Sequence, residues 1–188
     1  MSLFADYSPR VAGSRAELPP DVELRVAHRS DASALARLCH EREGGDLERH
    51  ELAFETELIR AASAGEPRLW VATRAGKVIA YSRVHLRTLD SDATEHDAPA
   101  GWYLGGVVVA PAHRRLGIAS ALTRVRLEWL RSRTDCAFYV ANALNRASLD
   151  LHSKLGFRER SREFRFPGVS FTGGVGVLSE LRFKRKSD

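Results

Sequence analysis

The segment 107–120 constrains the fold of this chain more than any other stretch of its sequence. It reads Val-Val-Val-Ala-Pro-Ala-His-Arg-Arg-Leu-Gly-Ile-Ala-Ser, so an apolar, β-branched run leads through a short basic turn into the start of a helix. A strand that passes directly into a helix is typical of α/β domains. The first amides of a helix have no intrahelical partner and lie at its positive end, so we expect this turn to bind an anion.

The residues of this turn favour a pyrophosphate as the anion. Gly117 lets a ligand approach the backbone closely, the small side chains of Ala119 and Ser120 leave room for a bulky phosphate, and Arg114 and Arg115 add positive charge. The chain contains no Gly-x-x-x-x-Gly-Lys-Ser/Thr loop of the kind that binds nucleoside triphosphates. A glycine-rich run at 173–176 precedes a predicted strand, which argues against a dinucleotide-binding turn.

Hydrophobic periodicity predicts the remaining elements and a single α/β domain. The expected order is β-α-α-β-β-β-α-β-α-β-β, which indicates a central mixed β-sheet of about seven strands flanked by about four helices. Strands are expected at 22–26, 69–73, 78–86, 102–109, 138–140, 158–166 and 175–183, and helices from Ser30 or Asp31 and at 46–64, 117–133 and 148–155. The domain is expected to span 21–183, with a loose arm at 1–20 and a basic tail at 184–188.

The sequence also predicts the cap of the first helix and the buried face of the long helix. Ser30 or Asp31 is a candidate N-cap of the first helix, on which Cys39 is expected to face the core. The long helix that begins near Gly117 has Ile118, Leu122, Val125 and Trp129 at spacings of four, three and four, which predicts one buried stripe.

Charge and composition exclude several classes of protein. The 188 residues carry a formal net charge of +5, but the last seven residues contribute +3 and the first twenty are balanced, so the body of the chain is only weakly basic. A nucleic-acid partner is therefore disfavoured. The two cysteines form neither a disulfide framework nor a metal cluster, and no stretch approaches the roughly 20 apolar residues of a membrane span. We expect a cytoplasmic protein with no metal and no membrane partner.

Two motifs give the chain a family resemblance. Arg114-x-x-Gly117-x-Ala119 resembles the Arg/Gln-x-x-Gly-x-Gly/Ala coenzyme A signature of the GCN5-related N-acetyltransferase (GNAT) superfamily. The stretch from Asn145 to Phe157 resembles the second signature of that superfamily, Asn-x-x-Ala/Ser-x-x-Leu/Phe-Tyr-x-x-x-Gly-Phe. In that stretch Asn145 can cap a helix, Leu151 and Leu155 are expected to form a buried pair, and Gly156-Phe157 is suited to end the helix. The resemblance implies a GNAT-like fold.

The resemblance also implies acetyl-CoA as the acyl donor and a set of residues that bind it. The end of the strand would contact the pantetheine arm and the thioester, the helix start would hold the pyrophosphate, and the second motif would contact the pantetheine region. The implied cofactor-binding residues are Val107, Val108, Val109, Arg114, Arg115, Leu116, Gly117, Ile118, Ala119, Ser120, Asn145 and Ser148.

His152 occupies the position where the family commonly has a tyrosine that protonates the departing CoA thiolate. An imidazolium can supply that proton near neutral pH, so His152 is the candidate catalytic residue, and a polar surface histidine is the alternative interpretation. The general base stays open because Gly105-Gly106 stands where many relatives have an acidic residue. The candidate bases are Glu41, Glu43, His85, Glu95, His96 and Asp97.

The resulting hypothesis is an N-acetyltransferase that moves an acetyl group from acetyl-CoA to a primary amine by direct transfer in a ternary complex. The acidic loop at 90–97 favours a small cationic amine as acceptor, although a solvated surface loop explains the same residues. The alternatives are a non-catalytic CoA-binding regulatory module and an acyltransferase that uses another acyl-CoA or a hydroxyl acceptor. The expected partners are a small-molecule amine and, optionally, a second copy of the chain.

Overall fold

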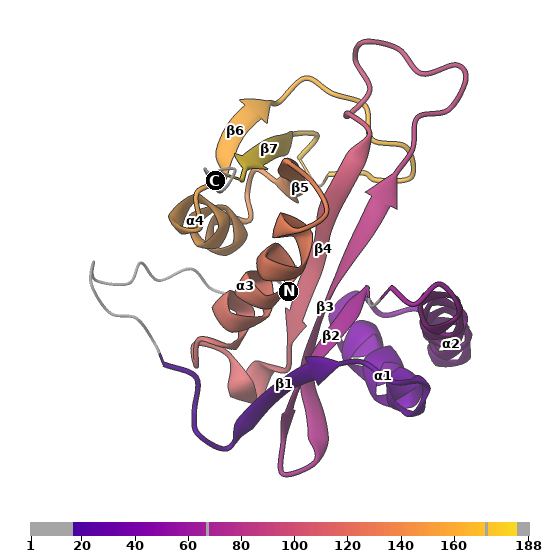
Figure 1. Cartoon of the computed structure of the whole chain (residues 1–188), viewed down its shortest axis with the longest axis vertical. Coiled ribbons are helices and arrows are strands. Elements are labelled where there is room, and N and C mark those ends of the chain that lie inside the picture. Colours follow the sequence, from indigo (N-terminus) through magenta and orange to yellow (C-terminus); the bar gives the residue numbers. More distant parts are fainter. Residues whose placement is uncertain (1–16, 67, 172, 184–188) are drawn as a thin grey trace. The chain divides into compact units, whose positions relative to one another are not determined.

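The computed structural model describes residues 17–66, 68–171 and 173–183, and within them it has the predicted α/β fold (Figure 1). The strands form a mixed sheet in the order β1-β2-β3-β4-β5-β7-β6. The strands are β1 (Val22–Val26), β2 (Leu69–Arg74), β3 (Lys77–Arg87), β4 (Gly101–Val109), β5 (Cys136–Asn142), β6 (Arg158–Ser161) and β7 (Gly176–Arg182). The α-helices are α1 (Ala32–Glu43), α2 (Leu47–Ser63), α3 (Ile118–Arg131) and α4 (Arg146–Lys154). The predicted tail at 184–188 and most of the predicted arm lie outside the described residues.

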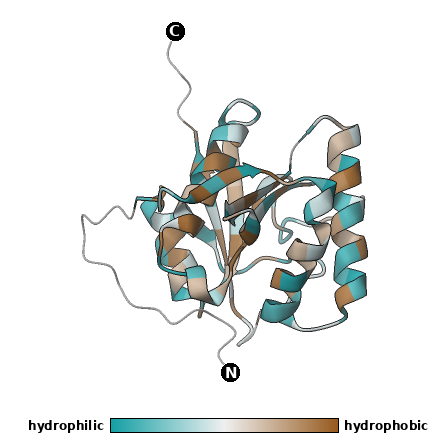
Figure 2. Ribbon diagram, turned by 90° about the horizontal axis from the view of Figure 1, so that it is seen from below, coloured by the Kyte–Doolittle hydropathy of each residue, from teal (hydrophilic) through white to brown (hydrophobic). Residues whose placement is uncertain are grey.

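The chain divides into two compact units, which share β3, β4 and α3. We call residues 17–84 with 106–126 the N-terminal unit, and residues 85–105 with 127–183 the C-terminal unit. In the N-terminal unit β1 and β3 pair with β2 in antiparallel register, and α1 and α2 lie side by side (Figure 1). Both helices carry hydrophobic and hydrophilic residues (Figure 2), and the buried hydrophobic ones belong to the core of this unit. The core of this unit includes Leu35, Leu38, Cys39, Phe54, Leu58, Val71, Tyr81 and Val108.

The start of α1 differs from the simple cap that the sequence suggests. Asp31 stands at the N-cap, but its side chain makes no capping bond to the helix. Its carboxylate instead accepts two hydrogen bonds from Arg25 at 2.7 and 2.8 Å and one from the backbone N–H of His28 at 2.8 Å. Burial is the largest single influence on the pKa of Asp31 and raises it, but the hydrogen bonds from Arg25 and His28 together outweigh burial and hold that pKa below its ordinary value. Asp31 therefore ties β1 to the turn before α1.

The buried face of α3 is wider than predicted and includes an arginine. Ile118 and Leu122 are buried as expected, whereas Val125 and Trp129 are only half-buried. Arg126 is completely buried, and its Nη1 donates to the carbonyl of Arg83 at 2.9 Å. Burial lowers the pKa of Arg126 to about 9. The hydrophobic pattern misses this face because the helix buries the long polar side chain along with its apolar neighbours.

The C-terminal unit is built around β5. β5 pairs with β7 in antiparallel register along its whole length, and it pairs in parallel with β4 at Tyr103–Phe138 and Leu104–Tyr139. β6 pairs with β7 but ends at Ser161, five residues before the predicted end at Phe166. The chain leaves the strand because Arg165 forms a parallel bridge with Asp97, in the loop between β3 and β4.

We call this connection the Asp97 clamp and define it by Asp97, Thr94, Arg87 and Arg165. The carboxylate of Asp97 accepts from Nε and Nη2 of Arg165 at 3.1 and 3.0 Å, from the backbone N–H of Thr94 at 2.9 Å and from Nη2 of Arg87 at 3.5 Å. These donors lower the pKa of Asp97 to about 2, with Arg165 as the largest cause. The backbone N–H of Ala98 donates to the carbonyl of Arg165 at 2.9 Å. The clamp therefore joins two loops that are 68 residues apart in sequence.

The clamp leads to a testable change in stability with pH. Because the folded-state pKa of Asp97 is lowered, its contribution is complete above about pH 4, the ordinary value of an aspartate, and is lost as pH falls toward 2. We expect Asp97→Asn to lower the melting temperature by a few degrees at pH 7, with the difference narrowing below pH 4. Asp92→Asn, an exposed carboxylate of the same loop, is the control and should change little. An equal effect of both substitutions at pH 7 would contradict the clamp.

Candidate functional site

The turn between β4 and α3 has a backbone conformation that only a few residue types adopt easily. Ala110 anchors it through a 2.9 Å hydrogen bond from its N–H to the carbonyl of Ile79. Arg115 has φ +68° and Gly117 has φ +80°, so both lie in the left-handed region. Glycine tolerates this conformation, whereas an arginine there costs on the order of 1–2 kcal/mol. Strain of this kind is found at ligand-binding turns, where successive N–H groups form a concave site for an anion.

The first turn of α3 continues this set of donors. The first helical hydrogen bond runs from the N–H of Ala121 to the carbonyl of Gly117 at 3.0 Å. The N–H groups of Ile118, Ala119 and Ser120 therefore precede the ladder and lie at the positive end of the helix. Ile118 is buried and anchors the turn, while Ala119 and Ser120 are half-buried and present little bulk. The predicted cofactor-binding residues Arg115, Leu116, Gly117, Ile118, Ala119 and Ser120 form the turn and the start of α3.

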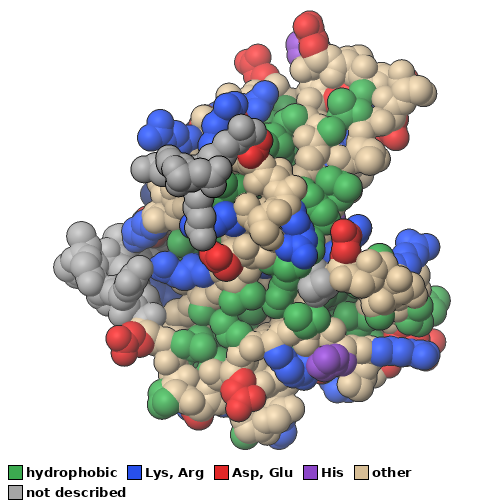
Figure 3. Space-filling view, in the orientation of Figure 1, with side chains coloured by type: hydrophobic (Ala, Val, Ile, Leu, Met, Phe, Trp, Pro, Cys, Tyr) green, Lys and Arg blue, Asp and Glu red, His purple; other side chains and the backbone are tan. Residues whose placement is uncertain are grey.

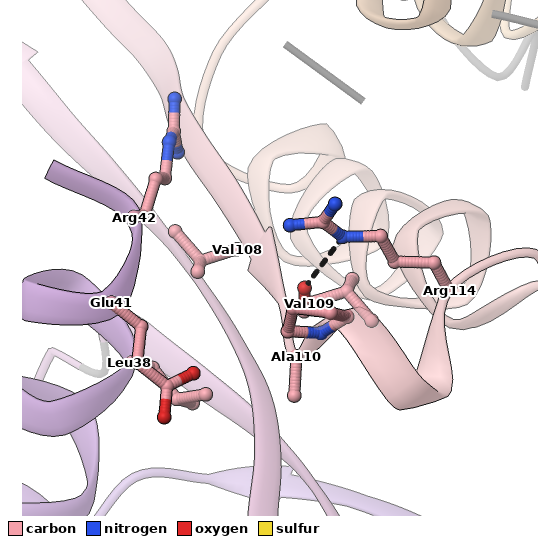
Figure 4. Close-up of a pocket in the computed structure, with 8 residues that line it drawn as sticks. Leu38, Glu41, Arg42, Val108, Val109, Ala110 and Arg114 are labelled. Carbon is pink, nitrogen blue, oxygen red and sulfur yellow. Dashed lines mark hydrogen bonds between the residues drawn. The ribbon is translucent and has the colours of Figure 1, made fainter. Parts of the chain in front are cut away.

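Arg114 is used differently from the other residues of the motif. Its Nε donates to the carbonyl of Val109 at 3.2 Å, which ties the turn back to the end of β4 (Figure 4). The two residues line a small crevice with Leu38, Glu41 and Arg42 of α1, whose volume of about 20 Å³ holds little more than one water. Part of the guanidinium of Arg114 therefore stabilises the turn itself.

The three predicted strand residues differ in exposure. The side chain of Val108 is buried against α1, whereas Val107 and Val109 are half-buried. The backbone carbonyl of Val109 already accepts a hydrogen bond from Arg114, so a ligand would share this acceptor with Arg114.

The second motif forms α4 in the way the sequence predicts. Asn145 is the N-cap, and its side chain accepts from the N–H of Ser148 at 3.2 Å. At the other end Gly156 has φ +96°, its N–H donates to the carbonyl of Ser153 at 3.0 Å, and the N–H of Phe157 donates to the carbonyl of His152 at 3.1 Å. These two bonds are a Schellman ending, which explains why glycine follows the helix.

The buried position of α4 is taken by a histidine. His152 is only 3% exposed, whereas Leu151 and Leu155 are both half-buried, so the predicted buried leucine pair is wrong. Nδ1 of His152 lies 2.9 Å from the carbonyl oxygen of Ser148, one turn earlier. His152 is therefore not the polar surface residue of the alternative interpretation.

Tyr139 of β5 contacts both His152 and Ser148, although neither sequence motif includes it. Its ring stacks on His152 with centroids 3.7 Å apart and planes 8° from parallel. Its hydroxyl donates to Oγ of Ser148 at 2.9 Å, and burial raises the pKa of Tyr139 to about 12. The apolar run along β5, most of which is buried, was the available signal, but it does not identify the helix that covers these residues.

The candidate bases are in very different surroundings. Glu95 and His96 are exposed, with 89% and 78% of their side chains accessible. His85 stacks on Tyr103 at 5.5 Å, and Glu41 lines the crevice beside Arg114. Asp97, with a pKa of about 2, is a poor proton acceptor at neutral pH, which removes it from this set.

The described residues contain neither a cluster of metal ligands nor a membrane-spanning helix. No group of three or more His, Cys, Asp or Glu side chains in this part of the chain could hold a metal ion. None of the described helices combines the length and the apolar character that a membrane span requires.

Comparison with solved structures identifies the fold. The ribosomal-protein-S18-alanine N-acetyltransferase of Escherichia coli matches with a TM-score of 0.61 and 18% identity over 89% of this chain and 97% of that one. The ribosomal-protein-alanine N-acetyltransferase of Brucella melitensis gives 0.63 and 21% over 86% and 99%. YncA of Salmonella typhimurium, solved with its cofactor acetyl-CoA, gives 0.64 and 20% over 89% and 97%. At these identities the likeness establishes the fold alone.

Comparison by sequence gives the family. No curated protein matches the chain. A family model does match: that of the acetyltransferase (GNAT) family, over residues 32–157, which is more than half of the chain and contains both motifs. Because the family model and the fold agree, this chain belongs to the GNAT family of acetyltransferases, whose acyl donor is acetyl-CoA.

Proposed function

We propose that this protein transfers the acetyl group of acetyl-CoA to a primary amine by direct attack in a ternary complex. The observation that carries the proposal is the turn from Arg115 to Ser120, where a left-handed backbone leads into helix-start amides that precede the first helical hydrogen bond and suit a pyrophosphate. The motif roles of Val107, Val108, Val109, Asn145 and Ser148 toward the pantetheine arm are part of the same proposal.

The proposed reaction needs one proton removed and one supplied. The amine nitrogen attacks the thioester carbonyl carbon, the tetrahedral intermediate collapses, and the C–S bond breaks to leave the amide and the CoA thiolate. The nitrogen gives up a proton to water or a side chain, and we propose that His152 protonates the sulfur. Its position in the motif, its burial and the Nδ1 bond to Ser148 support that role, because they hold the ring in one orientation.

An amine acceptor is supported by the structural neighbours. Two of them are alanine N-acetyltransferases of ribosomal proteins, so this fold serves transfer to nitrogen in those enzymes. The two free cysteines, Cys39 and Cys136, fit action in the reducing cytoplasm. Release of free thiol from acetyl-CoA, measured over a panel of amines, peptides and alcohols, tests the proposal against the alternatives. A CoA-binding module would bind acetyl-CoA with no acceptor-dependent turnover.

The first prediction concerns donor binding. Gly117→Glu forces a side chain onto a backbone with φ +80° and places a carboxylate beside the expected pyrophosphate. We expect the dissociation constant of acetyl-CoA, measured by calorimetry, to rise at least tenfold, or about 1.4 kcal/mol. Gly65→Glu is the matched control, because Gly65 has φ +62° with open space around it at the end of α2. Equal affinity of the two variants would contradict the donor site.

The second prediction concerns the proton donor. We expect His152→Ala to lower kcat by roughly 10–1000-fold, with partial rescue by water, while acetyl-CoA affinity stays within about twofold. His40→Ala, at an exposed position of α1, is the control and should retain the parent rate. A His152→Ala enzyme with parental kcat, measured where chemistry limits turnover, would show that His152 donates no proton.

The third prediction concerns a cationic acceptor. With Asp97 held in the clamp, the preference depends on Asp90, Asp92 and Glu95, which are exposed on the loop between β3 and β4. Figure 3 shows acidic side chains at the end of the molecule where this loop lies. Changing Asp92 and Glu95 to their amides should lower kcat/KM for a cationic amine and reduce its salt dependence, because long-range attraction between exposed charges is screened by salt. Acetyl-CoA affinity is the internal control. Unchanged kinetics at low and high ionic strength would remove the loop from acceptor selection.

A further inference from the structure

The environment of His152 is built from two aromatic rings in addition to its own helix. Tyr139 lies face to face with the imidazole, at 3.7 Å between centroids and 8° between planes. Phe157 meets the imidazole edge-on at 5.3 Å and 76°, and meets Tyr139 at 5.9 Å and 69°. Because Phe157 is fixed by the Schellman ending of α4, both neighbours of the imidazole belong to the ordered framework of the C-terminal unit.

Ser148 joins the histidine and the tyrosine at their polar atoms. Its carbonyl oxygen lies 2.9 Å from Nδ1 of His152, and its hydroxyl oxygen accepts from the hydroxyl of Tyr139 at 2.9 Å. A carbonyl oxygen can only accept, so Nδ1 carries a hydrogen in this arrangement. Nε2 is then the ring nitrogen at which His152 can gain or lose a proton without breaking the bond to Ser148.

The stacking geometry favours a ring that becomes positively charged. Two neutral aromatic rings prefer an offset or edge-on arrangement to a face-to-face sandwich. Centroids 3.7 Å apart leave little lateral offset, because ring atoms in contact are already about 3.5 Å apart. A cation over the face of a tyrosine is attracted by the ring quadrupole, so the stacked ring of Tyr139 offsets part of the cost that burial places on an imidazolium.

We propose that Tyr139 is a positioning residue for the acetyl transfer: by stacking on His152 and bonding Ser148, it fixes the Nδ1–H tautomer and holds the ring as a proton donor at Nε2. The inference rests on the proposed role of His152. In the step, the Nε2–H bond of the imidazolium breaks as the S–H bond of CoA forms. The ring is left neutral with its hydrogen on Nδ1, and water returns the second proton. Tyr139 and His152 together thus take the place of the single tyrosine common in the family.

The test uses nitrogen-15 NMR of the histidine ring together with steady-state kinetics. In the parent protein at alkaline pH, where the ring is neutral, the proposal expects the Nδ1–H tautomer of His152 to dominate. Tyr139→Phe keeps the stacked ring and loses only the hydroxyl, so kcat should stay within about threefold. Tyr139→Leu removes the ring face, so kcat should fall at least tenfold with an unchanged KM for acetyl-CoA, and the Nε2–H tautomer should appear. Phe138→Leu, which removes the preceding buried aromatic of β5, reports the effect of lost packing alone.

The NMR tautomer and the kcat values of the variants can each contradict the proposal. A parent spectrum dominated by the Nε2–H tautomer overturns the proposal, and this measurement needs no variant to fold. Equal kcat values for Tyr139→Leu, Phe138→Leu and Tyr139→Phe also overturn it. If Tyr139→Leu does not fold, Ser148→Ala and Tyr139→Phe, which break the same hydrogen bond from its two sides, should weaken the tautomer preference equally, and unequal effects contradict the arrangement. If His152→Ala retains the parental kcat, by contrast, the acid role of His152 is refuted, whereas the tautomer measurement stays valid.

Discussion

The backbone of the turn between β4 and α3 is the constraint on which the donor site depends. Two left-handed residues, Arg115 and Gly117, lie just before the first turn of α3, and in the proposed donor site their conformation directs consecutive N–H groups toward one anion. Gly117 adopts this shape without cost, but Arg115 does not, so the surrounding structure must hold it. The bonds of Ala110 to Ile79 and of Arg114 to Val109 do so by fixing the turn to the sheet. The turn is thus preorganised for its ligand.

In the second motif, a group of three residues stands where the family commonly has one tyrosine. Where the second motif has a tyrosine, this chain has His152, buried under α4, with Tyr139 from the sheet stacked on it and Ser148 bonded to both. A phenol is provided by the strand instead of the helix, and the helix provides an imidazole. The exchange keeps an ionisable group at the motif position while changing which atom can release the proton.

Local patterns predicted most of the fold. The neighbouring strands expected at 69–73 and 78–86, the cap at Asn145 and the helix stop at Gly156 each depend on residues a few positions apart, and all three are present. The turn that we propose binds the donor could be located for the same reason, because its glycine, its small residues and its helix start are contiguous. The predicted ends of the elements were less accurate. For example, β6 stops at Ser161, before the segment in which Arg165 pairs with Asp97 of a distant loop.

The features that the sequence did not reveal all depend on contacts between distant segments. Asp97 looked like one of several free carboxylates of an acidic loop until Arg165, 68 residues later, was seen to hold it. Arg126 is completely buried, and no local pattern indicates that a carbonyl of β3 accepts its hydrogen bond. Tyr139 and His152 are thirteen positions apart and come together only when α4 packs on β5. Side-chain partners of this kind are set by tertiary packing, and a linear pattern gives no access to them.

The central claim is that the turn from Arg115 to Ser120 recognises the pyrophosphate of the acyl donor. The most direct measurement compares kcat/KM for acetyl-CoA with that for S-acetylpantetheine, which has the same thioester and pantetheine arm but no pyrophosphate. The account predicts that the truncated donor is at least tenfold poorer, because it forgoes the helix-start amides and their positive potential. Equal kcat/KM values for the two donors would contradict it.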